Sequence, residues 1–361
     1  MLAIGCWRFI PDFLPTYFFD MAALICGSLA FDTIMTFEGR FAEQILPDQL
    51  HILNVSFLVP SLRRDFGGCA GNIAYSLKLL GGEPLPMAML GSDGADYLQR
   101  LELLGISARH VGQVQDTYTA QAMIMTDRDN NQITAFHPGA MMQAHVNRIE
   151  ADVGVSVGII APDGRDAMLE HAAQFVAAGI PFVFDPGQGL PMFNGEELAR
   201  FVDQASWVTV NDYEGKMLCD RTGWTLAEIS NKVKGLVVTL GAEGCEVWVD
   251  GQKTHVPAVV PAQVVDPTGC GDAWRGALLF GLEKGWPLVR CAELGNRVGA
   301  LKIAQRGPQN YTLDFIPAYL GQLSIKSRGA SLLPASCVAR RVVCNTNRHK
   351  KTRCAGTGLS V

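Results

Sequence analysis

Alternating strand-like and helix-like segments fill the second half of this 361-residue chain and constrain its fold more than any other feature. Short apolar runs rich in Val and Ile are each followed by a segment with apolar residues at helical spacing. Such alternation is typical of a parallel sheet covered by helices on both faces. The predicted strands are 157–161, 181–185, 207–210 and 236–240, with a hairpin at 245–249 and 252–256, and the predicted helices are 167–178, 195–204, one from 213, one from 272 and 289–304.

The first half begins with the same rhythm but contains segments that depart from it. A strand is predicted at 22–26, a helix at 73–80 and a further strand at 86–90. Residues 34–60 and 117–136 are instead strand-rich without intervening helices, and the second of these segments turns at the polar residues 127–131. We expect these two segments to form a separate small sheet, a lid over the functional site.

Composition indicates a globular enzyme-sized chain and excludes several other classes of protein. Hydrophobic residues make up 48% and charged residues 18%, and no apolar run reaches the roughly 18 to 20 residues of a membrane span. The ten cysteines contain no Cys-X-X-Cys pair, which favours reduced thiols in a cytoplasmic protein. We therefore expect a small-molecule partner, no membrane partner and no nucleic-acid partner.

Both ends of the chain differ in composition from the remainder. Residues 1–20 are rich in aromatic residues and are interrupted by Pro11 and Pro15, a poor match to a signal peptide. Residues 324–361 contain eight Lys and Arg but no Asp or Glu, so residues 1–323 carry a net charge of −13. We predict one domain at 21–323, an extension of doubtful status at 1–20 and a disordered basic tail at 324–361. Nucleic-acid binding by that tail is the alternative.

A glycine-rich turn before a predicted helix carries the strongest chemical signal in the chain. It reads Gly269-Cys270-Gly271-Asp272 and precedes an apolar helical pattern. Backbone N–H groups at such a junction bind anions, helped by the helix dipole. A carboxylate placed there can take a proton from a hydroxyl while the amides hold the phosphoryl group that the hydroxyl attacks. Taken alone, the same four residues also fit a turn whose aspartate caps a helix.

Further polar residues follow the predicted strands, and their positions support a common cleft. In parallel α/β sheets, ligands bind at the carboxyl ends of the strands. The residues that lie just after a predicted strand are Asp32, Asp93, Asp163, Asp185, Asn211, Glu214 and Gly241.

Three motifs in order make the chain resemble the ribokinase-like (PfkB) family of sugar and nucleoside kinases over about residues 22–322. They are residues 66–72 followed by Gly81-Gly82, the Asn-X-X-Glu element at 211–214, and residues 266–272. The resemblance implies a ribokinase-like three-layer α/β sandwich with a mostly parallel central sheet and a small β lid. It also implies ATP and Mg²⁺ as cofactors and, as in some relatives, a monovalent cation such as K⁺. Lid strands form dimer interfaces in some members, so the oligomeric state stays open between monomer and homodimer.

The resemblance and the chemistry together assign a role to each motif residue. Asp272 is the expected general base, and the backbone of Gly269, Cys270 and Gly271 is the expected anion hole. Glu214 is expected to bind Mg²⁺ through water, because Mg²⁺ keeps several of its waters, and Asp266 is the expected monovalent-cation ligand. The expected substrate-binding residues are Asp32, Gly67, Gly68 and Asn72, and the expected ATP-binding residues are Asn211, Gly241, Gly244 and Asn296.

The acceptor is predicted from the apolar residues of the two lid segments. A flat apolar wall suits a purine ring better than a bare sugar. The chain is most similar to bacterial adenosine kinase-type members, so we predict phosphorylation of the 5′-hydroxyl of adenosine to AMP. A ribokinase-type sugar kinase and a non-catalytic nucleoside or nucleotide sensor are the alternatives. The wall residues are Ile34, Phe37, Phe41, Ile45, Leu46, Phe57, Leu58, Tyr118, Met123, Met125 and Phe136.

Overall fold

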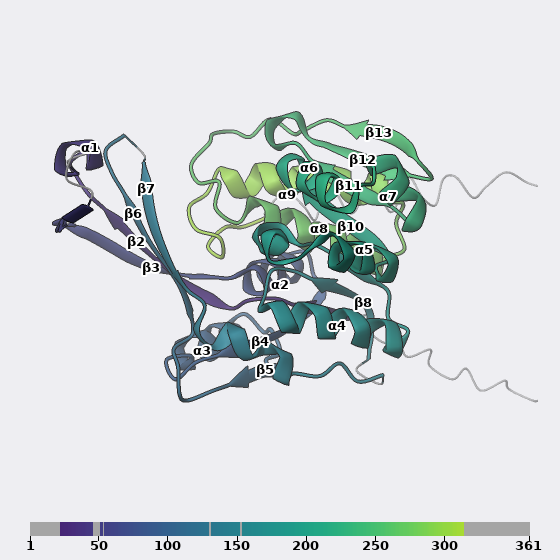
Figure 1. Cartoon of the computed structure of the whole chain (residues 1–361), viewed down its shortest axis with the longest axis horizontal. Coiled ribbons are helices and arrows are strands. Elements are labelled where there is room, and N and C mark those ends of the chain that lie inside the picture. Colours follow the sequence, from purple (N-terminus) through teal and green to yellow (C-terminus); the bar gives the residue numbers. More distant parts are fainter. Residues whose placement is uncertain (1–21, 46–50, 53, 130, 152–153, 314–361) are drawn as a thin grey trace, which may run out of the picture. The chain divides into compact units, whose positions relative to one another are not determined.

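A computed structural model describes residues 22–45, 51–52, 54–129, 131–151 and 154–313 (Figure 1). The predicted extension at 1–20 and the predicted basic tail at 324–361 lie outside these residues.

The central element is a nine-stranded sheet in the order β13-β12-β11-β10-β9-β8-β1-β4-β5. Seven neighbouring strands of this order, β11-β10-β9-β8-β1-β4-β5, pair in parallel. The strands β12 and β13 form an antiparallel hairpin at one edge. This confirms the predicted mostly parallel α/β sheet. The strands are β1 (Ala22–Cys26), β4 (Glu83–Leu90), β5 (His110–Gln113), β8 (Val155–Ile160), β9 (Phe182–Phe184), β10 (Trp207–Asn211), β11 (Leu236–Thr239), β12 (Cys245–Val249) and β13 (Gln252–Val256).

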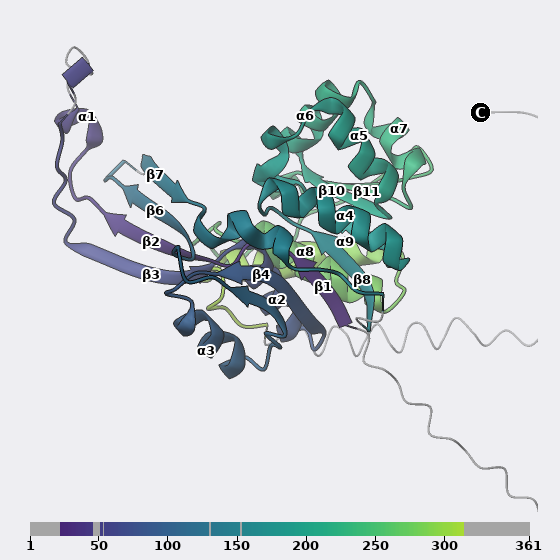
Figure 2. The same cartoon turned by 60° about the horizontal axis from the view of Figure 1, so that its bottom comes forward.

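Helices cover both faces of this sheet and complete the three layers. One group, α4 to α7, lies together on one face, and α8 packs against α2 and α9 in the other group (Figures 1 and 2). No helix within the described residues is long and apolar enough to span a membrane. The helices are α2 (Cys69–Leu79), α3 (Ala95–Leu103), α4 (Arg165–Ala178), α5 (Gly195–Gln204), α6 (Asp212–Thr222), α7 (Leu226–Lys232), α8 (Cys270–Glu283) and α9 (Leu288–Ile303), with short 3-10 turns η2 (Gly139–Val146), η3 (Gly187–Met192) and η4 (Gly241–Glu243).

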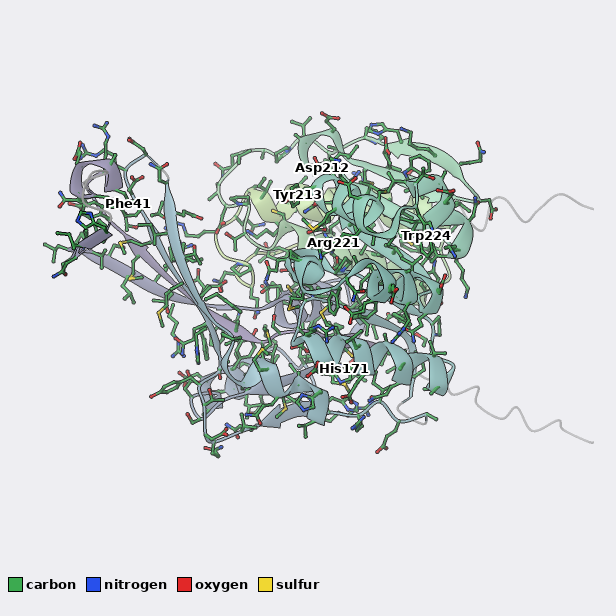
Figure 3. The ribbon with its side chains drawn as sticks, in the orientation of Figure 1. Phe41, His171, Asp212, Tyr213, Arg221 and Trp224 are labelled. Atoms are coloured by element: carbon green, nitrogen blue, oxygen red, sulfur yellow. The ribbon has the colours of Figure 1, made fainter. Side chains whose placement is uncertain are left out.

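The lid is a separate four-stranded sheet in the order β3-β2-β6-β7, and it projects from the body of the molecule (Figure 1). Its strands are β2 (Ala30–Thr36), β3 (Ser61–Gly67), β6 (Ala120–Thr126) and β7 (Gln132–His137). The sequence analysis predicted the first lid strands within residues 34–60. In the structure β2 begins before this range and β3 lies after it. The strand β3 was not predicted, because it contains the charged run Arg63-Arg64-Asp65. Most of its residues are exposed or half-buried, so it lacks a continuous apolar face. The short helix α1 (Phe41–Gln44) lies between them, and Phe41 marks the far end of the lid (Figure 3).

The sequence prediction also missed the strand β5 and the helix α7. The strand β5 is four residues long and only partly buried, so it has little apolar pattern. The helix α7 carries a readable signal at its start. The Thr225 hydroxyl accepts a hydrogen bond from the Glu228 amide at 3.2 Å, and the Glu228 carboxylate accepts one from the Thr225 amide at 2.7 Å. This reciprocal capping box has the Thr-X-X-Glu signature of a helix start.

The core between the sheet and the α4–α7 layer is rich in stacked aromatic rings. Phe184 on β9 stacks on Phe201 of α5 with ring centroids 4.4 Å apart, and Phe193 meets Phe201 edge to face at 5.0 Å. All three side chains are 1% exposed or less. Aromatic pairs in such geometries add to the free energy gained from burial alone.

We expect Phe201→Ala to lower the free energy of unfolding by about 3–5 kcal/mol, because it leaves a cavity beneath β9. Urea unfolding followed by tryptophan fluorescence measures the change. Val176→Ala, at a half-exposed position on α4, is the control and should change the free energy by less than about 0.5 kcal/mol. Equal effects of the two substitutions would contradict this description of the core.

Candidate active site

A cavity of about 760 Å³ lies where the carboxyl ends of the parallel strands, the lid and the start of α8 converge. Six residues predicted for substrate, base and anion binding meet there, from the lid strand β2 and from the starts of α2 and α8. Gly67 ends β3 and packs directly against the carboxylate of Asp32. The predicted residues that line the cavity are Asp32, Gly68, Asn72, Asn211, Glu214, Gly269, Gly271 and Asp272.

A hydrogen bond joins the two halves of the predicted catalytic set. The Asn72 side-chain amide donates to the Asp272 carboxylate at 2.8 Å, across 200 residues of sequence. The other end of the Asn72 side chain is fixed, because Gln309 donates to its carbonyl oxygen at 3.0 Å and to the Tyr97 hydroxyl at 2.8 Å. Gln309 and Tyr97 therefore orient Asn72 toward Asp272. Neither was predicted, and neither lines the cavity itself.

The Asp272 carboxylate is held in a state suited to proton transfer. Burial raises its pKa to about 6, while the hydrogen bond from Asn72 and the nearby Arg275 act in the opposite direction. Within the described residues, no salt bridge includes Asp272. A carboxylate with a pKa close to the working pH can accept a proton and release it again, which is what a general base requires.

The glycines of the first motif permit close packing around Asp32. Gly68 has a φ of +84°, and a Cβ atom there would lie 2.5 Å from the Ser28 carbonyl oxygen, so only glycine fits. Burial raises the pKa of Asp32 to about 6, with smaller contributions in the same direction from Asp65 and Asp272. The site thus holds two carboxylates whose titrations are coupled.

A buried ion pair forms the floor of the cavity and was not predicted. Arg275, one turn after Asp272 on α8, donates to both carboxylate oxygens of Asp185 at 2.9 and 2.8 Å. Both residues are buried and line the cavity. Asp185 was expected among the polar residues that follow the strands. Both of its carboxylate oxygens are bonded to Arg275. The sequence does contain an indication of this pair, because Arg275 lies within the apolar run Ala273–Ala277. A buried arginine needs a partner of opposite charge.

The start of α8 carries the predicted anion hole. Gly269 has a φ of +74° and its carbonyl accepts the Ala273 amide at 2.9 Å, while the Cys270 amide donates back to the Pro267 carbonyl at 3.2 Å. Among the residues that the structure describes, none accepts a hydrogen bond from the amides of Gly271 and Asp272. These two amides, at the positive end of the helix dipole, are therefore available to an anion, whereas Cys270 already uses its own.

A second cavity of about 630 Å³ adjoins the first, and the two share Gly271. Three of the predicted ATP-binding residues, Gly241, Gly244 and Asn296, line it together with Cys270 and Trp274. The Asn296 carbonyl oxygen accepts from the Trp274 indole at 3.0 Å, and its amide donates to the backbone carbonyls of Val256 and Pro257. Asn296 thus holds the wall of this cavity with all of its polar atoms.

The Asn-X-X-Glu element lies on the first cavity, although Asn211 was predicted on the ATP side. Asn211 and Glu214 form a capping box at the start of α6, with bonds of 2.7 and 2.8 Å. One oxygen of Glu214 is used in this way, and burial raises the pKa of its carboxyl group. Within the described residues, no three acidic, His or Cys side chains form a group that could hold a metal alone. An Mg²⁺ ion beside Glu214 would need its other ligands from water and from the phosphates of a nucleotide, which fits the preferences of that ion.

Asp266 differs from its expected role. One carboxylate oxygen accepts the Thr268 amide and the other accepts the Gly307 amide, both at 2.9 Å, which holds the pKa of this carboxyl group below its usual value. Its backbone carbonyl accepts a hydrogen bond from the ammonium of Lys302 at 2.8 Å. The Lys302 ammonium lies at the Asp266 carbonyl, where it would repel a second cation, so the residues present do not fit K⁺.

The lid contributes different apolar residues from those predicted. Among the predicted wall residues that the structure describes, Phe136 alone lines the first cavity, and its lid neighbours there are Ala122, Ile124 and Thr134. Leu46 lies outside the described residues. Met123 and Met125 alternate with Ala122 and Ile124 on β6 and therefore point to the other face of the lid. Phe37, Phe41 and Phe57 pack on one another, with ring centroids 5.0 to 5.8 Å apart. The prediction was wrong for Met123 and Met125 because they lie on the face of β6 that does not line the cavity.

The opposite wall of the cavity comes from η3, which contributes Gln188, Gly189 and Met192. Arg221, at the end of α6 (Figure 3), donates to the carbonyls of Leu190 at 3.3 Å and Pro191 at 3.1 Å and so anchors this turn. Asp163 also lines the cavity and is 3% exposed. Burial raises its pKa to about 8, so it holds a proton at neutral pH.

Solved structures of known function are similar to this chain. The nucleoside kinase of Burkholderia thailandensis in complex with inosine is 51% identical, covers 83% of this chain and 97% of its own, and superposes with a TM-score of 0.74. The same enzyme in complex with ADP-inosine is 53% identical over 81% of this chain and 92% of its own, with a TM-score of 0.70. A nucleoside kinase of Methanocaldococcus jannaschii is 29% identical over 294 residues, which cover 80% of this chain and 93% of that protein.

The family model of the pfkB carbohydrate kinases matches residues 39–314. This match includes β3, β6 and β7 of the lid, every strand of the central sheet except β1, and the Gly269–Asp272 turn. The chain is therefore a phosphotransferase and belongs to the pfkB family of carbohydrate kinases.

Proposed function

We propose that this protein is an ATP-dependent purine nucleoside kinase that phosphorylates the ribose 5′-hydroxyl, with adenosine giving AMP and inosine accepted at the same site. The observation that carries the proposal is the 2.8 Å hydrogen bond between Asn72 and Asp272, at the place where the two cavities meet. Acceptor and donor nucleotides need separate sites that open onto one reacting point, and Gly271 is common to both cavities.

The nucleoside occupies the first cavity. Asp32 and Asn72 offer an acceptor and a donor for the ribose hydroxyls, and Gly68 lets the backbone approach the sugar. The base lies among Ile124, Phe136, Met141 and Met192, which line the same cavity. Gln188 also lines this cavity. Its side-chain carboxamide can both donate and accept a hydrogen bond. It therefore suits the 6-amino group of adenosine and the 6-oxo group of inosine.

ATP occupies the second cavity, with its γ-phosphoryl group directed at the amides of Gly271 and Asp272. The Asp272 carboxylate takes the proton of the 5′-hydroxyl as that oxygen forms its bond to the γ-phosphorus. The bond between the γ-phosphorus and the bridging oxygen breaks, and ADP leaves. Glu214 would hold Mg²⁺ through its water ligands, and that ion would supply neutralisation of the phosphate charge. Positioning and charge neutralisation supply most of the rate in such transfers.

Two alternatives make different predictions. A ribokinase-type sugar kinase needs no apolar extension beyond the sugar, but this cavity holds Phe136, Met141 and Met192 beside Gln188. A non-catalytic sensor has no need of a buried carboxylate with a raised pKa beside free helix amides. The nucleoside kinase accounts for both features, and the identity of 51% to an inosine-bound nucleoside kinase supports it.

We expect ADP release with adenosine and with inosine, and much slower release with ribose, fructose or fructose 6-phosphate. Asp272→Asn should lower kcat by about 10²- to 10⁴-fold, because the general base is lost, while the nucleoside dissociation constant stays within a factor of a few. Coupled ADP assays and calorimetry measure these quantities. The matched control is Asp250→Asn in the β12–β13 turn, where asparagine tolerates the positive φ of 49°.

Turnover with sugars alone would overturn the nucleoside assignment while leaving the role of Asp272 intact. Unchanged turnover in Asp272→Asn would overturn that role. Nucleoside binding without turnover by the wild-type protein would favour the sensor.

The pH dependence follows from the raised pKa values. Asp272 must be ionised to accept a proton, so we expect kcat/KM to rise with pH through a pKa near 6 and to level off above it. Because Asp32 also titrates near 6, the measured value belongs to the pair. Asp32→Asn should raise KM for the nucleoside and retain this acidic limb. A limb at the ordinary aspartate value of 3.8 would contradict the burial argument.

A further inference from the structure

Lys302 is a buried cation that the proposed chemistry does not use directly. It lies in the last turn of α9, its side chain is 0% exposed, and its ammonium donates to the Asp266 backbone carbonyl at 2.8 Å. A lysine with no exposure to solvent is rare and requires compensation. Here the compensation comes from the Asp266 carboxylate and from the negative end of the α9 dipole.

The segment that Lys302 contacts leads directly into the anion hole. Residues 265 and 266 donate their amides to the Ile303 carbonyl at 2.8 and 3.1 Å, and the Asp266 carboxylate binds the amides of Thr268 and Gly307. The Lys302 ammonium therefore belongs to a hydrogen-bonded network. This network joins the backbone of residues 265–268, the end of α9 and the turn at 307. Gly269 follows this network directly in the sequence. The position of the network therefore sets the direction of the Gly271 and Asp272 amides.

Two cationic side chains of the protein already lie beside Asp266. Arg63 of β3 forms a salt bridge with Asp65 at 3.0 Å and approaches Asp266 to 3.8 Å. Asp266 thus has Lys302 and Arg63 as cationic neighbours, and Arg63 also has Asp65. A free cation placed at the Asp266 carbonyl would displace the ammonium or meet its repulsion.

We propose that the Lys302 ammonium takes the place of a monovalent cation behind the anion hole, so that the kinase works without K⁺. This inference rests on the proposed kinase function. Lys302 acts through the backbone of residues 266–269 and is a positioning residue, because it touches neither the acceptor nor the nucleotide cavity. An ammonium and a monovalent cation share the same unit charge and the same affinity for carbonyl oxygen, but the ammonium is tethered and always present.

The first test is the cation dependence of the wild-type protein. Initial rates are measured with adenosine, ATP and Mg²⁺ in potassium, ammonium or tetramethylammonium chloride at equal ionic strength. We expect rates within about twofold of one another, because an ion without a site shifts no equilibrium. Strong activation by K⁺ would overturn the inference and leave the kinase function intact. Absence of turnover in every salt would instead overturn the kinase function.

The second test removes the ammonium. Lys302→Ala should lower activity in tetramethylammonium chloride by about 10- to 100-fold, as for other residues that orient a site from behind, and K⁺ or ammonium should restore part of it. These two ions should also raise the Tm of the variant but not of the wild type, since only the variant has a vacant site. Lys284→Ala, at an exposed lysine after α8, is the matched control and should show neither effect.

Full activity of Lys302→Ala without K⁺ would contradict the inference. So would a folded, weakly active variant that neither ion restores or stabilises. If the variant does not fold in any of these salts, the wild-type cation series decides the question.

Discussion

The hydrogen bond between Asn72 and Asp272 is the contact on which the site depends, and close packing of two helices makes it possible. A Cβ atom at Gly276 of α8 would lie 2.6 Å from the Ser76 side chain and 3.0 Å from the Ile73 carbonyl of α2. Glycine at this position lets the two helix axes approach, which brings the start of α8 beside the start of α2. Asn72 and Asp272 then meet at 2.8 Å, and the free amides at the start of α8 lie next to the same carboxylate.

The treatment of buried charge explains how the remaining groups divide between structure and chemistry. Asp185 is paired with Arg275, and Asp266 is held by two amides and by Lys302 through its carbonyl. Asp272 receives a neutral amide instead, and burial raises its pKa to about 6. Paired carboxylates maintain the architecture because their charge is fixed, whereas a carboxylate without a salt bridge remains free to exchange a proton.

Local pattern in the sequence was enough for the parallel sheet and for the glycine-rich turn before Asp272. The resemblance to the ribokinase-like family was needed to place Asn72 with Asp32 and Asp272 in one site. Local pattern was insufficient where a choice depends on tertiary context. Strand alternation does not say which face of β6 meets the cavity, so Met123 was chosen instead of Ile124. Nor does it say that Lys302 reaches the Asp266 carbonyl, because that contact joins two segments 36 residues apart.

The central claim is that the nucleoside lies in the first cavity with its 5′-hydroxyl directed at Asp272. The most direct measurement is the distance between the 5′-oxygen and the Asp272 carboxylate in a crystal structure with adenosine and a non-hydrolysable ATP analogue. The account predicts hydrogen-bond contact, about 2.6–3.2 Å, with the γ-phosphate at the amides of Gly271 and Asp272. A nucleoside whose 5′-oxygen points away from Asp272, or that binds outside this cavity, would contradict it.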